Sequence, residues 1–171
     1  MKYLILCINL LITTSVYGQD KFAITPNGLS PQFSTSRIDH LTRNQIYEKT
    51  LTWIELNEEA YKLSVQDKTE NEVIQLTSVK WNAVNLGEKY YTSEYNIHLI
   101  FEENKYKFEP TAIRLKLNSK YDMGWENFDL SNGDMYFKKD KIFKKYKVYL
   151  KDLMLGLNEV SLRLNSHLNA N

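Results

Sequence analysis

Residues that commonly carry out chemistry are sparse in this sequence and are not arranged in known motifs. Its three histidines are His40, His98 and His167, and none stands at a metal-binding spacing from another histidine, acid or cysteine pair. No serine-nucleophile elbow or glycine-rich phosphate loop occurs. Glu102 and Glu103 are adjacent, but neighbours on a strand face opposite sides and so cannot work together as acid and base. We therefore expect a protein that is not an enzyme and that holds no metal ion or other cofactor.

A set of polar and aromatic side chains is the first candidate for ligand binding. Along the strands expected at 91–101 and 105–117, apolar and polar residues alternate, so each strand has one apolar side and one polar side. If helices cover the apolar side, the other side of the sheet presents Tyr90, Thr92, Asn96, His98, Arg114 and Lys116. Such a set suits a sugar or a peptide, and it is equally suited to plain solvation.

Aromatic residues in the segment 118–137 are the second candidate. This segment is rich in turn residues, yet it also contains Tyr121, Trp125 and Phe128. Trp125 with its two aromatic neighbours could form a platform that stacks on a glycan. The alternative is that these rings pin the loop to the body of the protein.

A third candidate is an interaction surface on the last helix. Val148, Leu155 and Leu162 stand seven residues apart, on the side away from the main apolar stripe, and such a narrow seam can pair helices between chains. The alternative is that they lie against the aromatic loop. Two functions follow as hypotheses: a binding module for an envelope ligand or a peptide or protein partner, and an assembly or scaffolding protein that oligomerises or docks through this helix.

The first 18 residues have the pattern of an export signal. Lys2 precedes an apolar run at 4–12, and Gly18 ends a group of slim residues suited to signal peptidase, so we expect cleavage after Gly18. The run is too short to span a bilayer, which predicts an exported, periplasmic or extracellular protein that does not span the membrane. Cys7, the one cysteine, lies within this leader, so the mature chain is expected to have no disulfide.

Charge argues against nucleic acid as a partner. The leader contains Lys2 and no acid, so the chain from residue 19 onward has equal numbers of basic and acidic residues. A general nucleic-acid binder usually carries a basic excess, because neutralising phosphates supplies much of its affinity. The local runs at 138–141 and 144–145 are interpreted as the solvated face of a helix.

Periodicity predicts the elements in the first half of the domain. The segment 26–36 is interpreted as a long loop, and Thr42 with Gln45 forms a capping-box pattern at the start of an amphipathic helix that ends near Glu59. Strands are expected at 61–65 and 73–84, with a turn at 67–71 between them. A change of apolar parity near Ser78 indicates a bulge or strong twist there.

The second half continues the meander and ends in a long helix. After the strand at 91–101 we expect a hairpin turn at Glu103-Asn104, and Pro110 indicates a bulge or an edge position in the next strand. Asp140 is the expected cap of a final helix that extends to about Ser166. Gly156 is its expected place for a kink.

These elements predict an α+β fold in which two helices cover one face of a curved antiparallel sheet, in the order β-α-β-β-β-β-α. The expected division is a signal peptide at 1–18, an N-terminal strand and loop at 19–42, and a single domain at 43–168.

The segment from Asn44 to Leu117 resembles a family of secreted bacterial domains of unknown function with a TATA-binding-protein-like fold. The resemblance is carried by Ile46-Tyr47, Trp53-Ile54, Lys105-Tyr106-Lys107-Phe108 and Ile113-Arg114-Leu115. It implies a fold and an envelope location but no reaction. It does not imply DNA binding, because fold does not carry function and the polar side of the strand at 91–101 includes Glu94 and Glu102.

Overall fold

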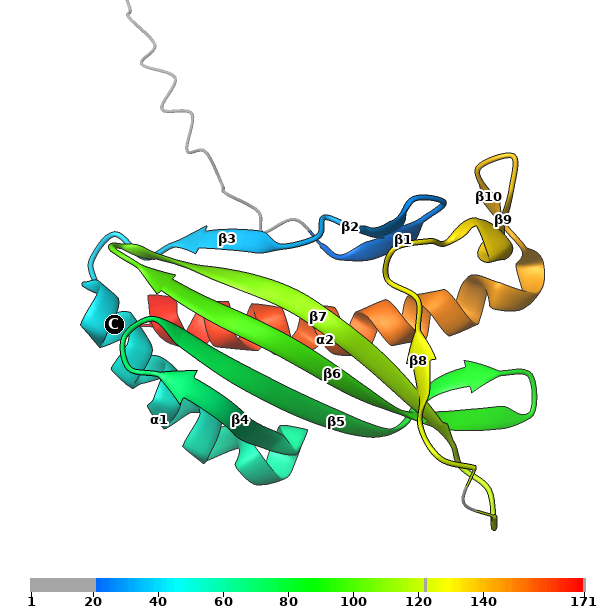
Figure 1. Cartoon of the computed structure of the whole chain (residues 1–171), viewed down its shortest axis with the longest axis horizontal. Coiled ribbons are helices and arrows are strands. Elements are labelled where there is room, and N and C mark those ends of the chain that lie inside the picture. The colour runs from blue at the N-terminus through cyan, green and yellow to red at the C-terminus, as the bar shows by residue number, and fades with distance from the viewer. Residues whose placement is uncertain (1–20, 122, 171) are drawn as a thin grey trace, which may run out of the picture.

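The protein has two layers, a twisted sheet and a pair of helices packed on one of its faces (Figure 1). This is a computed structural model, and it describes residues 21–121 and 123–170. The expected leader and its cleavage point after Gly18 lie outside the described residues.

The main sheet is a four-strand meander with short strands added at one side. The meander consists of β4 (Leu63–Thr69), β5 (Val73–Leu86), β6 (Lys89–Glu102) and β7 (Lys105–Leu117). β3 (Ser34–Arg37) pairs with the first part of β7, and β8 (Glu126–Phe128) pairs with its last part. The order across the sheet is therefore β3-β7-β6-β5-β4, with every pairing antiparallel.

Both helices lie on the same face of this sheet. α1 (Arg43–Tyr61) packs on β4, and α2 (Lys147–Asn169) runs across β5 and contacts α1 (Figure 1). Apolar residues of α2 recur every three or four positions, and Leu153, Leu157 and Leu164 are fully buried. On β6, Tyr95, Ile97 and Leu99 face the helices and are also buried. The predicted α+β class, with two helices on one side of a curved antiparallel sheet, is confirmed.

The start of α1 is also as predicted. The Thr42 side chain accepts a hydrogen bond from the Gln45 backbone N–H, and the Gln45 side chain accepts one from the Thr42 backbone N–H at 2.9 Å. This reciprocal pair satisfies two backbone donors that the helix itself cannot.

The interpretation of 26–36 as a loop was wrong. β1 (Ala23–Thr25) and β2 (Gly28–Ser30) form a hairpin, and β3 extends the main sheet by pairing with β7. Ser34 and Ser36 are buried by this pairing although they are polar. Such a strand has no apolar alternation to reveal it, because hydrogen bonds to a distant strand hold it in place.

The first turn of the meander was also misplaced. The segment 67–71 was expected to be a turn, but β4 continues to Thr69, and its last residues pair with β5 up to Val73. The turn is therefore confined to Glu70, Asn71 and Glu72, of which Asn71 has a positive φ of 59°.

The bulge in β5 lies a few residues beyond its predicted place. Ser78 pairs regularly with Tyr95, whereas three residues, Trp81 to Ala83, stand opposite Thr92 alone. Asn82 has a positive φ of 49°, which asparagine tolerates better than most residues. In β7 the predicted irregularity is confirmed, since the register shifts between Pro110 and Ala112.

Asp140 does not cap the last helix. Asp140 and Lys139 both have positive φ and form the turn between β9 (Phe137–Lys138) and β10 (Lys141–Ile142). Two such residues are what a two-residue hairpin turn requires. Short 3-10 turns, η1 (Asp134–Tyr136) and η2 (Lys144–Tyr146), flank this hairpin, and α2 begins only at Lys147. The sequence placed the lysine runs at 138–141 and 144–145 on the solvated face of a helix, but both runs precede α2, in the hairpin and in η2.

Candidate functional site

A hollow of about 490 Å³ opens on the helix-free face of the sheet, where the bulge of β5 approaches the end of β7. Two tryptophans, Trp81 and Trp125, line it from different elements. Its polar lining includes Asn82, Thr92, Lys116, Asn118 and Lys120.

Trp81 is placed by the β5 bulge. The three residues of the bulge break the alternation of the strand, and 70% of the Trp81 side chain is exposed. A bulge commonly turns a side chain in a new direction in this way. An exposed tryptophan loses the free energy of burial, so its position at the hollow favours a role in contact with a ligand.

Trp125 is held in place by an ion pair whose carboxylate is buried. The Arg114 guanidinium lies 5.5 Å from the centre of the Trp125 ring. Arg114 Nε also donates to Glu94 Oε1 at 2.7 Å, and the Glu94 side chain is only 10% exposed. Glu94 thus fixes Arg114, and Arg114 supports one face of Trp125.

The polar lining is itself hydrogen bonded. Thr92 Oγ1 donates to Asn118 Oδ1 at 2.8 Å, and the Asn118 amide nitrogen donates to Asn82 Oδ1. These bonds connect β6, the end of β7 and the β5 bulge. In the part of the chain that the structure describes, these bonds leave the amide hydrogens of Asn82 unused, and an amide of this kind can donate to a ligand oxygen.

The structure does not bring all the candidate ligand-binding residues of the sequence analysis together at one site. Lys116 and Trp125 meet at the hollow, and Arg114 supports Trp125 from outside it. Tyr90, Asn96 and His98 do not line the hollow. Tyr90 and His98 are eight positions apart on β6, roughly 27 Å along an extended strand, so one small ligand cannot contact both.

Part of the remaining polar set serves the sheet itself. Asn96 accepts from Thr77 Oγ1 at 2.8 Å and contacts Glu94, so its amide is already used. Thr92 and Glu94 are buried, although both belong to the polar side of β6. This face is therefore less open to solvent than alternation alone suggested.

Sequence reasoning missed Trp81, Asn82 and Asn118. The run at 73–84 was interpreted as a strand whose apolar parity changes near Ser78, and none of its residues was given a binding role. The shift of apolar parity in that run was the available signal, but it indicated the bulge a few residues too early.

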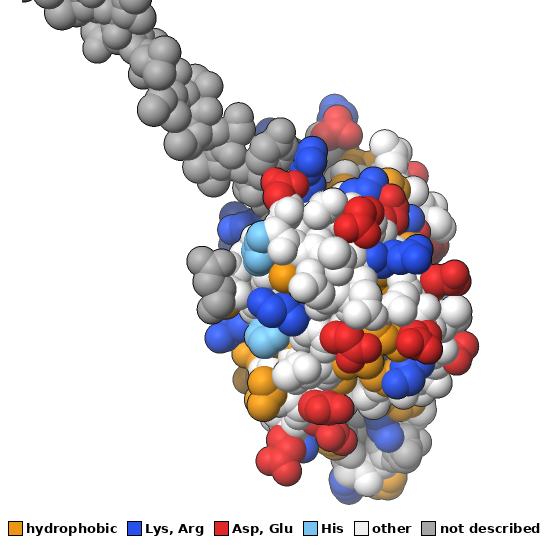
Figure 2. Space-filling model, turned by 90° about the vertical axis from the view of Figure 1, so that its left-hand side faces the viewer, with side chains coloured by type: hydrophobic (Ala, Val, Ile, Leu, Met, Phe, Trp, Pro, Cys, Tyr) orange, Lys and Arg blue, Asp and Glu red, His pale blue; other side chains and the backbone are white. Residues whose placement is uncertain are grey.

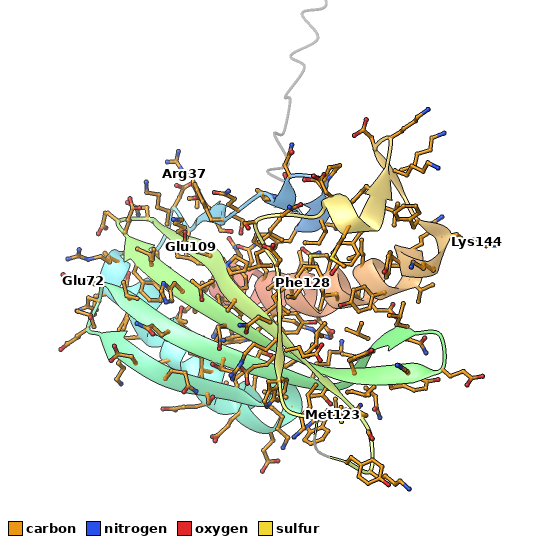
Figure 3. The ribbon with its side chains drawn as sticks, turned by 45° about the vertical axis from the view of Figure 1, so that its right-hand side comes forward. Arg37, Glu72, Glu109, Met123, Phe128 and Lys144 are labelled. Atoms are coloured by element: carbon orange, nitrogen blue, oxygen red, sulfur yellow. The ribbon has the colours of Figure 1, made fainter. Side chains whose placement is uncertain are left out.

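The expected aromatic platform is only partly present. Phe128 is buried and stacks on Tyr136 with ring centres 5.6 Å apart, which pins the loop to the body. Tyr121 is 64% exposed and does not line the hollow. Figure 3 shows Phe128 on β8 in front of α2, and Met123 on the loop that leads to it. Of Tyr121, Trp125 and Phe128, Trp125 is thus the residue that lines a space large enough for a ligand.

The seam on α2 is exposed. Val148, Leu155 and Leu162 are exposed by 56%, 56% and 43%. Leu155 and Leu162 line a shallow hollow of about 620 Å³ on the outer side of the helix. The aromatic segment 118–137 does not cover these three residues, so the alternative that they lie against it was wrong.

Within residues 21–121 and 123–170, no group of three or more histidine, cysteine or acidic residues has a geometry that could hold a metal ion. Over the same residues, no helix combines the length and apolar character needed to cross a bilayer.

Comparisons with known proteins give a likeness in structure but none in sequence. No family model matches the chain, and no curated protein matches it. A solved structure of a TBP-like protein from Parabacteroides distasonis is similar with a TM-score of 0.58 and 14% identity, covering 81% of this chain and 92% of that one. A DUF4468 family protein from Bacteroides ovatus is similar with a TM-score of 0.55 and 13% identity, covering 81% and 85%. At such low identity the likeness extends to the fold alone, and on that basis the chain has the TBP-like α+β fold that its sequence predicted.

Proposed function

We propose that this protein is an exported, non-enzymatic binding module, and that its ligand is an oligosaccharide bound in the hollow between Trp81 and Trp125. The observation that supports it is the presence of two exposed tryptophans at one concave space. Tryptophan rings stack on the apolar faces of sugar rings, and their exposure is otherwise unfavourable.

The polar lining suits the same class of ligand. Sugar hydroxyls need donors and acceptors set beside an aromatic face. Asn82 offers amide hydrogens, and Lys116 and Lys120 also line the hollow. The interstrand bonds of Thr92 and Asn118 hold this lining in place before a ligand binds, which reduces the entropy lost on binding.

Calorimetric titration with neutral and acidic oligosaccharides tests this proposal. Removal of a central aromatic contact commonly costs about 2 kcal/mol or more, so Trp81→Ala and Trp125→Ala should each raise Kd by at least about tenfold. Phe33→Ala is the matched control, because Phe33 is an exposed aromatic that does not line the hollow. If no oligosaccharide binds, or if both tryptophan variants bind as the unaltered protein does, the proposal is wrong.

The exposed seam on α2 supports a second candidate, a scaffolding protein that assembles through this helix. Val148, Leu155 and Leu162 are spaced for helix pairing and are not covered by the loop. Light scattering should then show a dimer or larger assembly, and Leu155→Glu should convert it to a monomer. A monomer in both proteins would exclude self-association through the seam.

A further inference from the structure

The segment 137–148 gathers positive charge at one end of the molecule. It contains six lysines and a single acid, Asp140. The lysines are Lys138, Lys139, Lys141, Lys144, Lys145 and Lys147. We call this segment the lysine-rich tip.

The shape of the tip makes these charges accessible. β9 and β10 form a small hairpin that projects from the body above the first turns of α2 (Figure 1). All six lysines are exposed, and Figure 3 shows Lys144 at the end of the molecule. Among the residues that the structure describes, none of the six forms an ion pair.

Apolar side chains are exposed at the same end. Ile142 and Phe143 are 40% and 38% exposed within the tip, and Val148 is 56% exposed at its end. Met135, two residues before the tip, is 64% exposed. Scattered exposed apolar residues are ordinary, but four beside an uncompensated set of lysines form a surface that is both basic and apolar.

The rest of the chain makes this concentration distinctive. From residue 19 onward basic and acidic residues are equal in number, so the excess of lysine in the tip is matched by an acidic excess elsewhere. At the opposite end of the molecule, basic and acidic side chains are interspersed (Figure 2). Although the net charge from residue 19 onward is zero, positive charge is concentrated at the tip, and acidic residues outnumber basic ones in the rest of that chain.

We propose that the lysine-rich tip docks the protein on the surface of a membrane that contains anionic phospholipids. The ammonium groups attract the headgroups, and Ile142 and Phe143 insert at the boundary between headgroups and acyl chains. A soluble polyanion would satisfy the lysines alone, whereas a bilayer also accommodates the apolar side chains. The tip is remote from the loop that carries Met123 and leads to Trp125, so docking leaves the hollow accessible (Figure 3).

Vesicle co-sedimentation tests this proposal with the chain from residue 19 onward, which retains every residue of the described fold. The apolar leader is left out because it could bind lipid directly and so produce sedimentation that does not depend on the tip. The protein should sediment with vesicles of phosphatidylcholine and phosphatidylglycerol, not with phosphatidylcholine alone. High salt should weaken binding, because salt screens the charges.

Two variants separate the charged contribution from the apolar one. Lys138→Glu/Lys139→Glu/Lys141→Glu should lower the partition coefficient by about tenfold or more, since each lysine near an anionic surface contributes severalfold. Ile142→Ser should lower it by a smaller factor without changing its salt dependence. A control, Arg43→Glu/Lys68→Glu/Lys89→Glu, makes the same change of charge at exposed sites elsewhere and should retain most of the binding.

Three results would overturn the proposal. The first is no binding to anionic vesicles at low salt. The second is an equal loss in the tip variant and in the control variant, which would mean that net charge alone is responsible. The third is that the protein binds soluble dextran sulfate as well as vesicles, and that Ile142→Ser leaves both kinds of binding unchanged. This result would mean that the tip binds anionic polymers in general. Circular dichroism of each variant checks that the fold is retained.

Discussion

The hydroxyl of Tyr95 on β6 lies directly beneath Gly156 of α2. It donates a hydrogen bond to the backbone carbonyl of Leu153 at 2.9 Å, and it leaves no space for a side chain on the glycine. α2 continues unbroken through Gly156, from Lys147 to Asn169. The glycine, expected from the sequence as a site for a kink, allows helix and sheet to approach closely.

Gly156→Ala should therefore destabilise the protein, although alanine is the better helix former. The helix gains about 1 kcal/mol from the exchange, whereas overpacking a closed contact costs about 1–3 kcal/mol. We expect a net loss of about 1 kcal/mol in the free energy of unfolding, measured by urea denaturation. Tyr95→Phe removes the obstructing oxygen, so the double variant should lose less than the sum of the single ones. Simple additivity would contradict the proposed contact.

The stability of the protein should fall in alkali. Burial raises the pKa of the Tyr95 hydroxyl from 10.0 to about 12. Between these values the unfolded chain has lost the proton and the folded protein still holds it, so rising pH favours unfolding. This group alone should lower the free energy of unfolding by about 1.4 kcal/mol per pH unit in that window.

Urea titrations from pH 8 to pH 11 can measure this decline, with Tyr95→Phe as the comparison. Burial also raises the pKa values of Tyr106 and Tyr149, so both proteins should lose stability, and the variant should lose it less steeply. Parallel slopes in the two proteins would mean that Tyr95 ionises normally in the fold.

The ion pair beneath Trp125 should matter to stability as well as to binding. Arg114→Gln leaves the Glu94 carboxylate buried without its guanidinium, and we expect a loss of about 1–3 kcal/mol in urea denaturation. Glu94→Gln/Arg114→Gln removes both charges and should recover part of that loss. If Arg114→Gln is as stable as the unaltered protein, the pair does not hold this part of the sheet.

The capping box at the start of α1 can be tested within one helix. Thr42→Ala removes the acceptor for the Gln45 N–H and should cost about 1 kcal/mol in the free energy of unfolding. Thr52→Ala is the matched control, because Thr52 is exposed on the same helix and its hydroxyl donates to the Glu48 carbonyl within that helix. We expect it to leave stability nearly unchanged, and equal losses in the two variants would contradict a specific role for the cap.

The sequence alone determined the features that depend on neighbours along the chain. The alternation of Tyr95, Ile97 and Leu99 with polar residues predicted β6, because successive residues of a strand face opposite sides. Thr42 and Gln45 marked the start of α1, because a capping box is complete within four residues. These local rules, with the long apolar stripe of α2, were sufficient to predict the fold class.

Tertiary structure decided what depends on residues distant in sequence. β3 exists because its backbone pairs with β7, and its serines carry no periodic signal. Trp81 and Trp125 meet because the register shift of β5 and the pairing of β8 with β7 place them at one hollow. Asp140 lies in a hairpin turn because β9 and β10 pair. In each case hydrogen bonds between separate strands fix the backbone, and no pattern in a single stretch of sequence specifies which strands will pair.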